Sequence, residues 1–204
     1  HELAHQWFGN KITCGTWKDI WLNEGFATYL DGLVVEHLDG QSAFVSWKNS
    51  KINNITSLPS GYVYLQDSDL SSVSRIFSSR LSYNKASMVV HMLRWVMGDI
   101  NFYQALRNYL ADPMLAYGYA VTTQLKSHLE AVHGTSLTEF FNDWVYQQGY
   151  PTYQVNATQN GVTVQIQLNQ TTSHVSVPFF EMPVPIRLVG SGGQIQNVVL
   201  NHAF

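Results

Sequence analysis

Apolar residues up to about position 148 recur every three to four positions, which places them on one face of an α-helix. Glycine directly after several of these segments is typical of a helix C-terminus, as at Gly40, Gly98 and Gly134. The pattern predicts a series of helices over residues 1–9, 21–38, 41–53, 82–97, 101–111 and 122–133, with one more ending near residue 148.

Sequence signals also predict how two of these helices begin. Ser136-Leu137-Thr138-Glu139 has the form of a capping box, in which the serine and glutamate side chains each accept a backbone N–H of the first turn. Thr122 or Thr123 is expected to cap the preceding helix. Residues 57–79 are rich in serine and have no clear period, so they are predicted to form a long functional loop.

The period changes to two after Pro151. Residues 152–157 and 162–168 alternate apolar and polar side chains around Asn160-Gly161, which predicts a β-hairpin. A second hairpin is predicted from residues 184–189 and 195–200, which flank a glycine-rich turn. We therefore expect an α+β chain, with a helical domain over 1–150 and the beginning of a small antiparallel β-domain over 151–204.

Composition narrows the class of protein. The 204 residues are 45% hydrophobic, as in an ordinary globular protein. Their net charge is −3, which gives no positive charge excess for binding nucleic acid or an anionic membrane surface. No apolar run approaches the roughly 20 residues that span a bilayer. Charged residues are only 12%, with many uncharged polar residues, a profile that favours an exported protein. The single cysteine, Cys14, excludes an internal disulfide and is expected to be a small core residue.

The candidate chemistry begins with His1-Glu2-Leu3-Ala4-His5, an HExxH pattern. Two histidines four positions apart on a helix lie one turn apart on the same face, so both imidazoles can reach one metal ion. Zinc accepts such nitrogen ligands. Glu2 lies beside them, where its carboxylate can act as a general base on a water molecule.

A third ligand is expected from Glu24. Eighteen residues separate His5 from Glu24, which lies near the start of the second predicted helix. If the connector turns the chain back, this carboxylate faces the two histidines. Two histidines and one glutamate leave a fourth zinc position open for water, as a catalytic site requires. The predicted zinc ligands are thus His1, His5 and Glu24.

Other residues allow more than one interpretation. Asp19 could orient a ligating histidine or cap the second helix, and Lys85 could be a solvated neighbour of the site or an orienting cation. A group of residues with helical spacing is expected to lie in the core: Met88, Met92, Leu93, Trp95 and Val96. The remaining histidines lack paired spacing and are interpreted as surface or core residues: His37, His91, His128, His133, His174 and His202.

Residues 1–10 and 17–27, with Asn-Glu-Gly-Phe-Ala around Glu24, resemble the M1 family of zinc aminopeptidases, which are gluzincins. The resemblance implies that the helices form the lower half of a thermolysin-like catalytic domain. Residues 82–90 resemble the family's Tyr-x-Lys-Gly-Ala segment, with Ala86 in the usual place of glycine. That match implies that Tyr83 stabilises the oxyanion of the reaction.

The resemblance implies release of N-terminal residues from peptide substrates. Glu2 would take a proton from a zinc-bound water molecule and return it to the leaving amine, while zinc and Tyr83 hold the oxyanion. Two alternatives stay open. One is a related gluzincin with endopeptidase or epoxide hydrolase activity, and the other is a non-catalytic binding or scaffold protein of the same fold.

The family's Gly-x-Met-Glu-Asn segment, which binds the free amino group of the substrate, has no match in this chain. Because the chain opens on His1, inside the motif, we expect the N-terminal half of the same polypeptide to be missing. That half is then a required partner of the residues present here. We also expect the isolated chain to bind zinc weakly, because its first helix has lost its earlier turns, and to be inactive.

Overall fold

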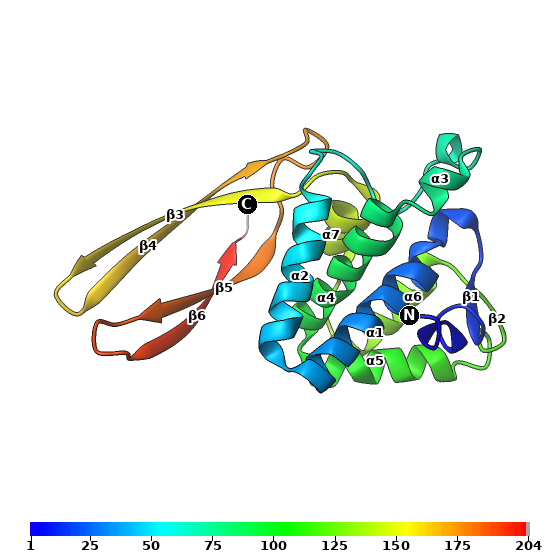
Figure 1. Ribbon diagram of the computed structural model, residues 1–204, viewed down its shortest axis with the longest axis horizontal. Helices are drawn as coiled ribbons and strands as arrows, with labels where there is room; N and C mark the ends of the chain where they lie inside the picture. Colours follow the sequence, from blue (N-terminus) through cyan, green and yellow to red (C-terminus); the bar gives the residue numbers. More distant parts are fainter. Residues whose placement is uncertain (203–204) are drawn as a thin grey trace.

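The computed structural model describes residues 1–202 and shows an α+β chain, with a helical body from which two β-hairpins extend to one side (Figure 1). The helices end at Tyr146 and the first long strand begins at Pro151. The α-helices are α1 Trp21–Asp39, α2 Gln41–Ile55, α3 Val73–Ile76, α4 Ala86–Met97, α5 Asp99–Ala111, α6 Thr122–His133 and α7 Thr138–Phe141.

The core lies among α1, α4, α5 and α6, because each of these helices presents an apolar face to the others. On α4, Met88 and Leu93 are buried, as the helical spacing predicted. Val89 and Val90, which were not in the predicted set, are completely buried as well. Trp95 was wrongly assigned to the core. It lies on the outer face of α4, remains 43% exposed, and donates its indole N–H to the Pro183 carbonyl at 2.7 Å.

Two predicted helices contain π-helical turns, over Ser79–Lys85 and Asn142–Tyr146. The capping box predicted at Ser136 is wrong. The N-cap residue of α7 is Leu137, whose side chain provides no cap. The Ser136 hydroxyl accepts the Thr138 N–H at 3.2 Å rather than the Glu139 N–H that a capping box requires. Glu130 of α6 accepts the Leu137 backbone N–H at 2.6 Å.

The helix predicted over residues 1–9 is also wrong. Only a 3₁₀ turn, η1 Ala4–Gln6, forms, because so short a segment closes too few hydrogen bonds to offset helix nucleation. Beyond it the Asn10 N–H reaches back to the His5 carbonyl at 2.8 Å. The chain then enters strand β1, Ile12–Cys14, which pairs in parallel with β2, Gly118–Ala120, a contact that the sequence did not predict.

The predicted loop over 57–79 is largely irregular but contains two short helical segments, η3 Asp67–Asp69 and α3.

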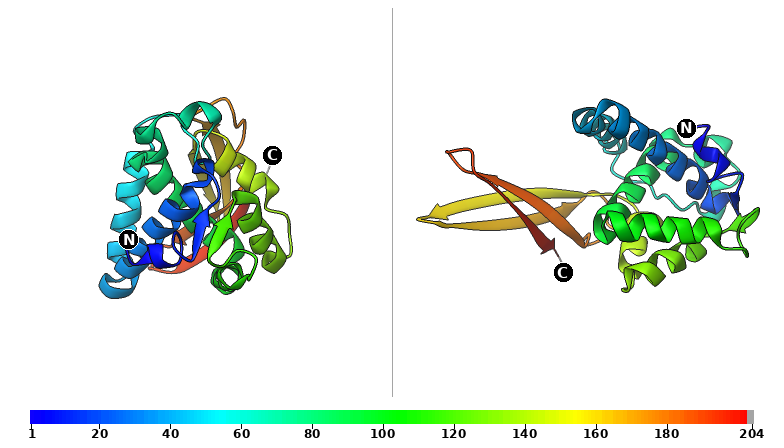
Figure 2. Two further views of the ribbon diagram at one scale, coloured as in Figure 1. Left: turned by 90° about the vertical axis from the view of Figure 1, so that its right-hand side faces the viewer. Right: turned by 90° about the horizontal axis from the view of Figure 1, so that it is seen from below.

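Both predicted hairpins are confirmed and are longer than expected, and they extend away from the helices (Figure 2). In the first hairpin Asn160 pairs with Thr163, so the turn is Gly161-Val162 rather than Asn160-Gly161. The four strands are β3 Pro151–Asn160, β4 Thr163–Thr172, β5 Met182–Val189 and β6 Ile195–His202. Within residues 1–202, no helix has the length and apolar character that a membrane crossing requires.

Asp19 joins the connector before α1 to the start of α6. Its side chain is 1% exposed and accepts both the Thr122 N–H, at 2.8 Å, and the Thr122 hydroxyl, at 2.7 Å. The Thr16 hydroxyl donates to the other carboxylate oxygen at 2.6 Å. Asp19 therefore neither contacts a ligating histidine nor caps α1. Thr122 is the first residue of α6, after the N-cap position Val121, and Asp19 supplies the acceptor for its backbone N–H.

We expect Asp19→Ala to lower the free energy of unfolding by about 3 kcal/mol, because it leaves the two buried donors of Thr122 without an acceptor. Urea denaturation of the variant measures this change. Asp39→Ala, at the exposed end of α1, is the control and should change stability by less than about 0.5 kcal/mol. Equal losses in the two variants would contradict the structural role of Asp19.

Candidate metal centre

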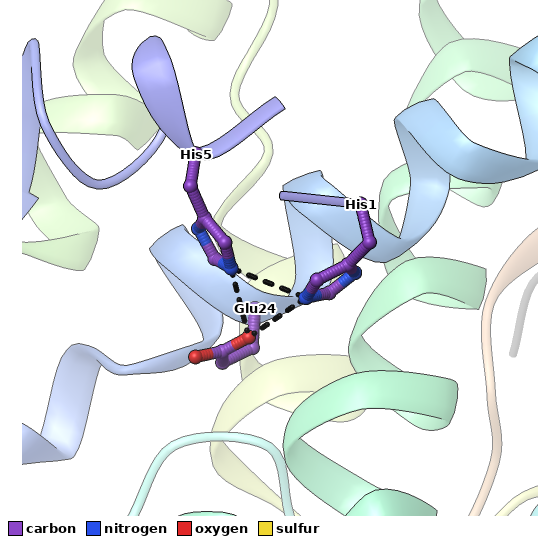
Figure 3. A group of neighbouring side chains, drawn as sticks. All are labelled: His1, His5 and Glu24. Atoms are coloured by element: carbon purple, nitrogen blue, oxygen red, sulfur yellow. Dashed lines mark hydrogen bonds and ion pairs between the residues drawn. The ribbon is translucent and has the colours of Figure 1, made fainter. Parts of the chain in front are cut away.

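Three side chains from two segments converge on one point (Figure 3). His5 lies in the η1 turn and His1 precedes it, and Glu24 comes from the first turn of α1. The two Nε2 atoms lie 3.1 Å apart, and Glu24 Oε2 lies 3.3 Å from His1 Nε2 and 3.4 Å from His5 Nε2. Within residues 1–202 this is the group of histidine, cysteine and acidic side chains whose geometry suits a metal ion.

The donor set fits zinc. Ligand atoms about 2.05 Å from a tetrahedral ion lie about 3.3 Å from one another. The three measured separations, 3.1 to 3.4 Å, bracket that value. Two imidazole nitrogens and one carboxylate oxygen are also the atom types that zinc prefers, with a fourth position left for another ligand. The residues present can therefore hold this ion without rearrangement.

A backbone carbonyl selects the tautomer of His5. Its Nδ1 lies 2.9 Å from the Phe8 carbonyl oxygen, which can only accept a hydrogen bond. The proton is therefore on Nδ1, and Nε2 keeps its lone pair toward Glu24 and His1. Phe8 is itself fixed in the core, 4% exposed, where its ring stacks on Phe26 at 4.5 Å.

Glu24 is a buried carboxylate, 8% exposed. Burial is the main cause that raises its pKa, and the nearby His5 opposes that rise. A carboxylate held in a poorly solvated position is stabilised when a cation neutralises it. A divalent cation bound by the three side chains would provide that charge.

Glu2 and Tyr83 line the same cavity, which has a volume of about 610 Å³. Glu2 is exposed beside the histidines, and the Tyr83 ring stacks on His1 with centroids 5.9 Å apart. Tyr83 lies in the π-helical turn Ser79–Lys85, a type of turn that is frequent at functional sites. Burial and the neighbouring Glu24 carboxylate raise the pKa of Tyr83 to about 12. Its hydroxyl therefore stays protonated at neutral pH and can donate a hydrogen bond.

Thr28 and Asp31 are among the residues of this cavity that sequence reasoning missed. The Thr28 hydroxyl is buried and has no hydrogen-bond partner within the described part of the chain, so it is available to a bound group. The signal was present in the sequence. These residues follow Glu24 by four and seven positions and therefore lie on the same face of α1.

A close helix contact sets the position of Glu24 relative to Tyr83. A Cβ atom placed on Gly25 would lie 2.6 Å from the Ala86 Cβ, well inside van der Waals distance. The absence of a side chain at Gly25 lets α1 approach the junction between the π-turn and α4. Ala86, completely buried, fills the space at this contact.

Two histidines and a glutamate around one point, with a second glutamate and a tyrosine on the same cavity, are features of the HExxH class of metal-dependent hydrolases. The sequence model described as "Peptidase family M1 domain" matches residues 1–144. The chain belongs to peptidase family M1.

Individual relatives agree with this assignment. Aminopeptidase M1-C of Oryza sativa subsp. japonica is 36% identical over 159 residues, which cover 76% of this chain and 18% of that protein. A mutant M1 zinc metallopeptidase from Deinococcus radiodurans, bound to a Tyr-Ser-Ala substrate, aligns with a TM-score of 0.56 and 29% identity. The alignment covers 65% of this chain and 29% of that one.

Aminopeptidase A of Legionella pneumophila, in complex with aspartic acid, aligns over 99% of this chain and 23% of its own, with a TM-score of 0.75 and 20% identity. This likeness shows the fold alone, and it includes the hairpins. The chain spans about a fifth of the length of the curated relatives that it matches.

We expect Gly25→Ala to lower the free energy of unfolding by about 1–3 kcal/mol and to weaken zinc binding, because the new methyl group pushes α1 away from Ala86. Urea denaturation and isothermal titration with zinc measure the two effects. The double variant Gly25→Ala/Ala86→Gly is the matched control and should recover most of both losses. Loss without recovery would show that the contact with Ala86 is not the cause.

Proposed function

We propose that the full-length protein is a zinc-dependent aminopeptidase, with His1, His5 and Glu24 as the zinc ligands. The observation that carries the proposal is the convergence of the three ligand atoms, all within 4.8 Å of one another. Membership of peptidase family M1 supports it. So do relatives that are named as aminopeptidases.

Zinc, when bound, would supply a Lewis acid that polarises a carbonyl group and lowers the pKa of water. The side chains supply the proton transfer and the hydrogen bond. The Glu2 carboxylate accepts a proton from the attacking water molecule at one of its oxygens and gives it to the leaving amine. The Tyr83 hydroxyl donates a hydrogen bond to the carbonyl oxygen of the scissile peptide as negative charge develops on it.

The proposed substrates are peptides with a free amino terminus. The relatives' names support this class, and the Deinococcus radiodurans structure holds a tripeptide. Because the chain spans about a fifth of its relatives' length, we assign the activity to the full-length protein, in which the rest of the polypeptide would complete the substrate site. We propose that the isolated 204-residue chain is inactive.

Hydrolysis of aminoacyl-p-nitroanilides by the full-length protein tests the proposal. Activity should disappear with a chelator and return with one zinc ion per chain. N-acetylated forms of the same substrates should not be cleaved, because the free amino group is blocked. Chelator-resistant activity, or a protein that binds zinc and cleaves neither substrate, would refute it.

Glu2→Gln should lower kcat by about 10²–10⁴-fold, because the amide cannot accept the proton from water. The zinc content should stay at one ion per chain, since Glu2 is not among the three converging ligands. Steady-state kinetics and metal analysis measure the two quantities. Glu139→Gln, an exposed glutamate in α7, is the matched control and should keep full activity.

Tyr83→Phe should lower kcat by about 10²–10³-fold with little change in KM, because the hydroxyl acts on charge that develops after the substrate has bound. The phenyl ring keeps the stacking contact with His1. Zinc affinity should fall only by the loss of the hydrogen bond from the Tyr83 hydroxyl to Glu24. A rise in KM with unchanged kcat would instead assign Tyr83 to substrate binding.

A further inference from the structure

A second cavity, of about 470 Å³, lies between α2, α4 and the segment that leads into β3. Figure 1 shows α2 and α4 side by side, with β3 leaving the helical body near them. The cavity shares no lining residue with the candidate metal centre. Much of its wall is apolar, formed by Val45, Ile52, Ile55, Met88, Met92 and Trp144.

The charged side chains of this wall are two lysines, Lys48 and Lys85, and no acidic residue lines it. Lys85 is 4% exposed, and its ammonium group donates to the Gly61 carbonyl at 2.7 Å. Lys48 Nζ lies 3.4 Å from His91 Nε2 and 4.6 Å from the centroid of the Phe44 ring. Neither lysine forms an ion pair with a carboxylate of the described residues.

Burial disfavours the charged form of both lysines. Burial, with Arg80 and Arg75 nearby, lowers the pKa of Lys85 to about 7. Burial also lowers the pKa of Lys48, although the Glu36 carboxylate opposes this shift. Burial and the Lys48 ammonium lower the pKa of His91 to about 4, so the imidazole is neutral at pH 7. Each shift shows that positive charge is disfavoured here, as expected where ammonium groups are desolvated without a counter-ion.

We infer that this cavity binds a small organic anion, a carboxylate carried on an aromatic or aliphatic body, with Lys48 as its ionic contact. A volume of about 470 Å³ lies within the range of small-molecule sites, about 300–1,000 Å³. The apolar wall accommodates the body of the ligand. The lysine, which lacks a carboxylate partner, attracts the carboxylate more strongly in a partly desolvated position than it would in water.

The same charges set the specificity of the cavity. A free amino acid or a peptide amino terminus carries an ammonium group, which would meet two lysines and no acidic side chain. An anion without an amino group avoids this repulsion. The ligand therefore belongs to a different chemical class from the peptide substrates proposed for the metal centre, and the inference does not depend on that proposal.

Isothermal titration of the full-length protein with 4-phenylbutyrate tests the inference. We expect a dissociation constant below about 1 mM and binding at least about tenfold weaker for 4-phenylbutanol, which has the same body without the charge. Lys48→Met should weaken 4-phenylbutyrate binding by about tenfold or more. This variant keeps the length and apolar stem of the side chain and removes a poorly solvated charge, so it should fold normally.

Lys11→Met is the matched control, because it removes the same charge at a residue that does not line the cavity. It should bind 4-phenylbutyrate as the unmodified protein does. Both variants keep the metal centre, so a carboxylate bound there contributes equally to both titrations. No binding to the unmodified protein, equal binding of the alcohol, or equal affinity in the Lys48→Met and Lys11→Met variants would overturn the inference.

Discussion

The close contact between Gly25 and Ala86 is the constraint on which the candidate site depends. Glu24 precedes Gly25 on α1. Tyr83 lies in the π-helical turn that ends just before Ala86, the first residue of α4. The separation between Gly25 and Ala86 therefore sets the distance between the Glu24 carboxylate and the Tyr83 hydroxyl. A methyl group on one side of the contact fills the space, and a second one does not fit. Packing at two small residues thus fixes the geometry of polar side chains that do not themselves hold the helices together.

Much of the fold could be predicted because its signals are local. Helical spacing and the following glycines located α1, α2 and α5, and alternation with turn residues located both hairpins. Some of the failures come from hydrogen bonds between segments that lie apart in the sequence. Asp19 reaches the start of α6 from 103 positions away, and Glu130 reaches Leu137 from the preceding helix. The spacing of residue types along the sequence does not reveal such contacts.

The candidate site was likewise predicted in part: the convergence of its side chains was predicted, and the backbone that carries the histidines was not. HExxH and the glutamate that follows it at a fixed spacing predicted which side chains converge, because both histidines come from one turn and Glu24 from the start of the next helix. The backbone that carries the histidines was predicted wrongly, as a regular helix rather than the η1 turn. The two imidazoles converge despite this difference. The turn still brings His1 and His5 to the same side, with their Nε2 atoms 3.1 Å apart, and the Phe8 carbonyl orients His5.

Desolvation of charged groups links the metal centre with the second cavity. At the metal centre burial raises the pKa of the Glu24 carboxylate, and at the cavity it lowers the pKa of Lys85. Both shifts mean that the neighbouring groups do not fully offset the cost of burying the charged form. The ion pair of Arg94 with Asp99 differs, because the Arg94 guanidinium donates to both oxygens of the Asp99 carboxylate, at 2.8 and 2.9 Å. A fold that buries one acidic and one basic group in separate cavities is suited to a cationic ligand at the first and an anionic ligand at the second.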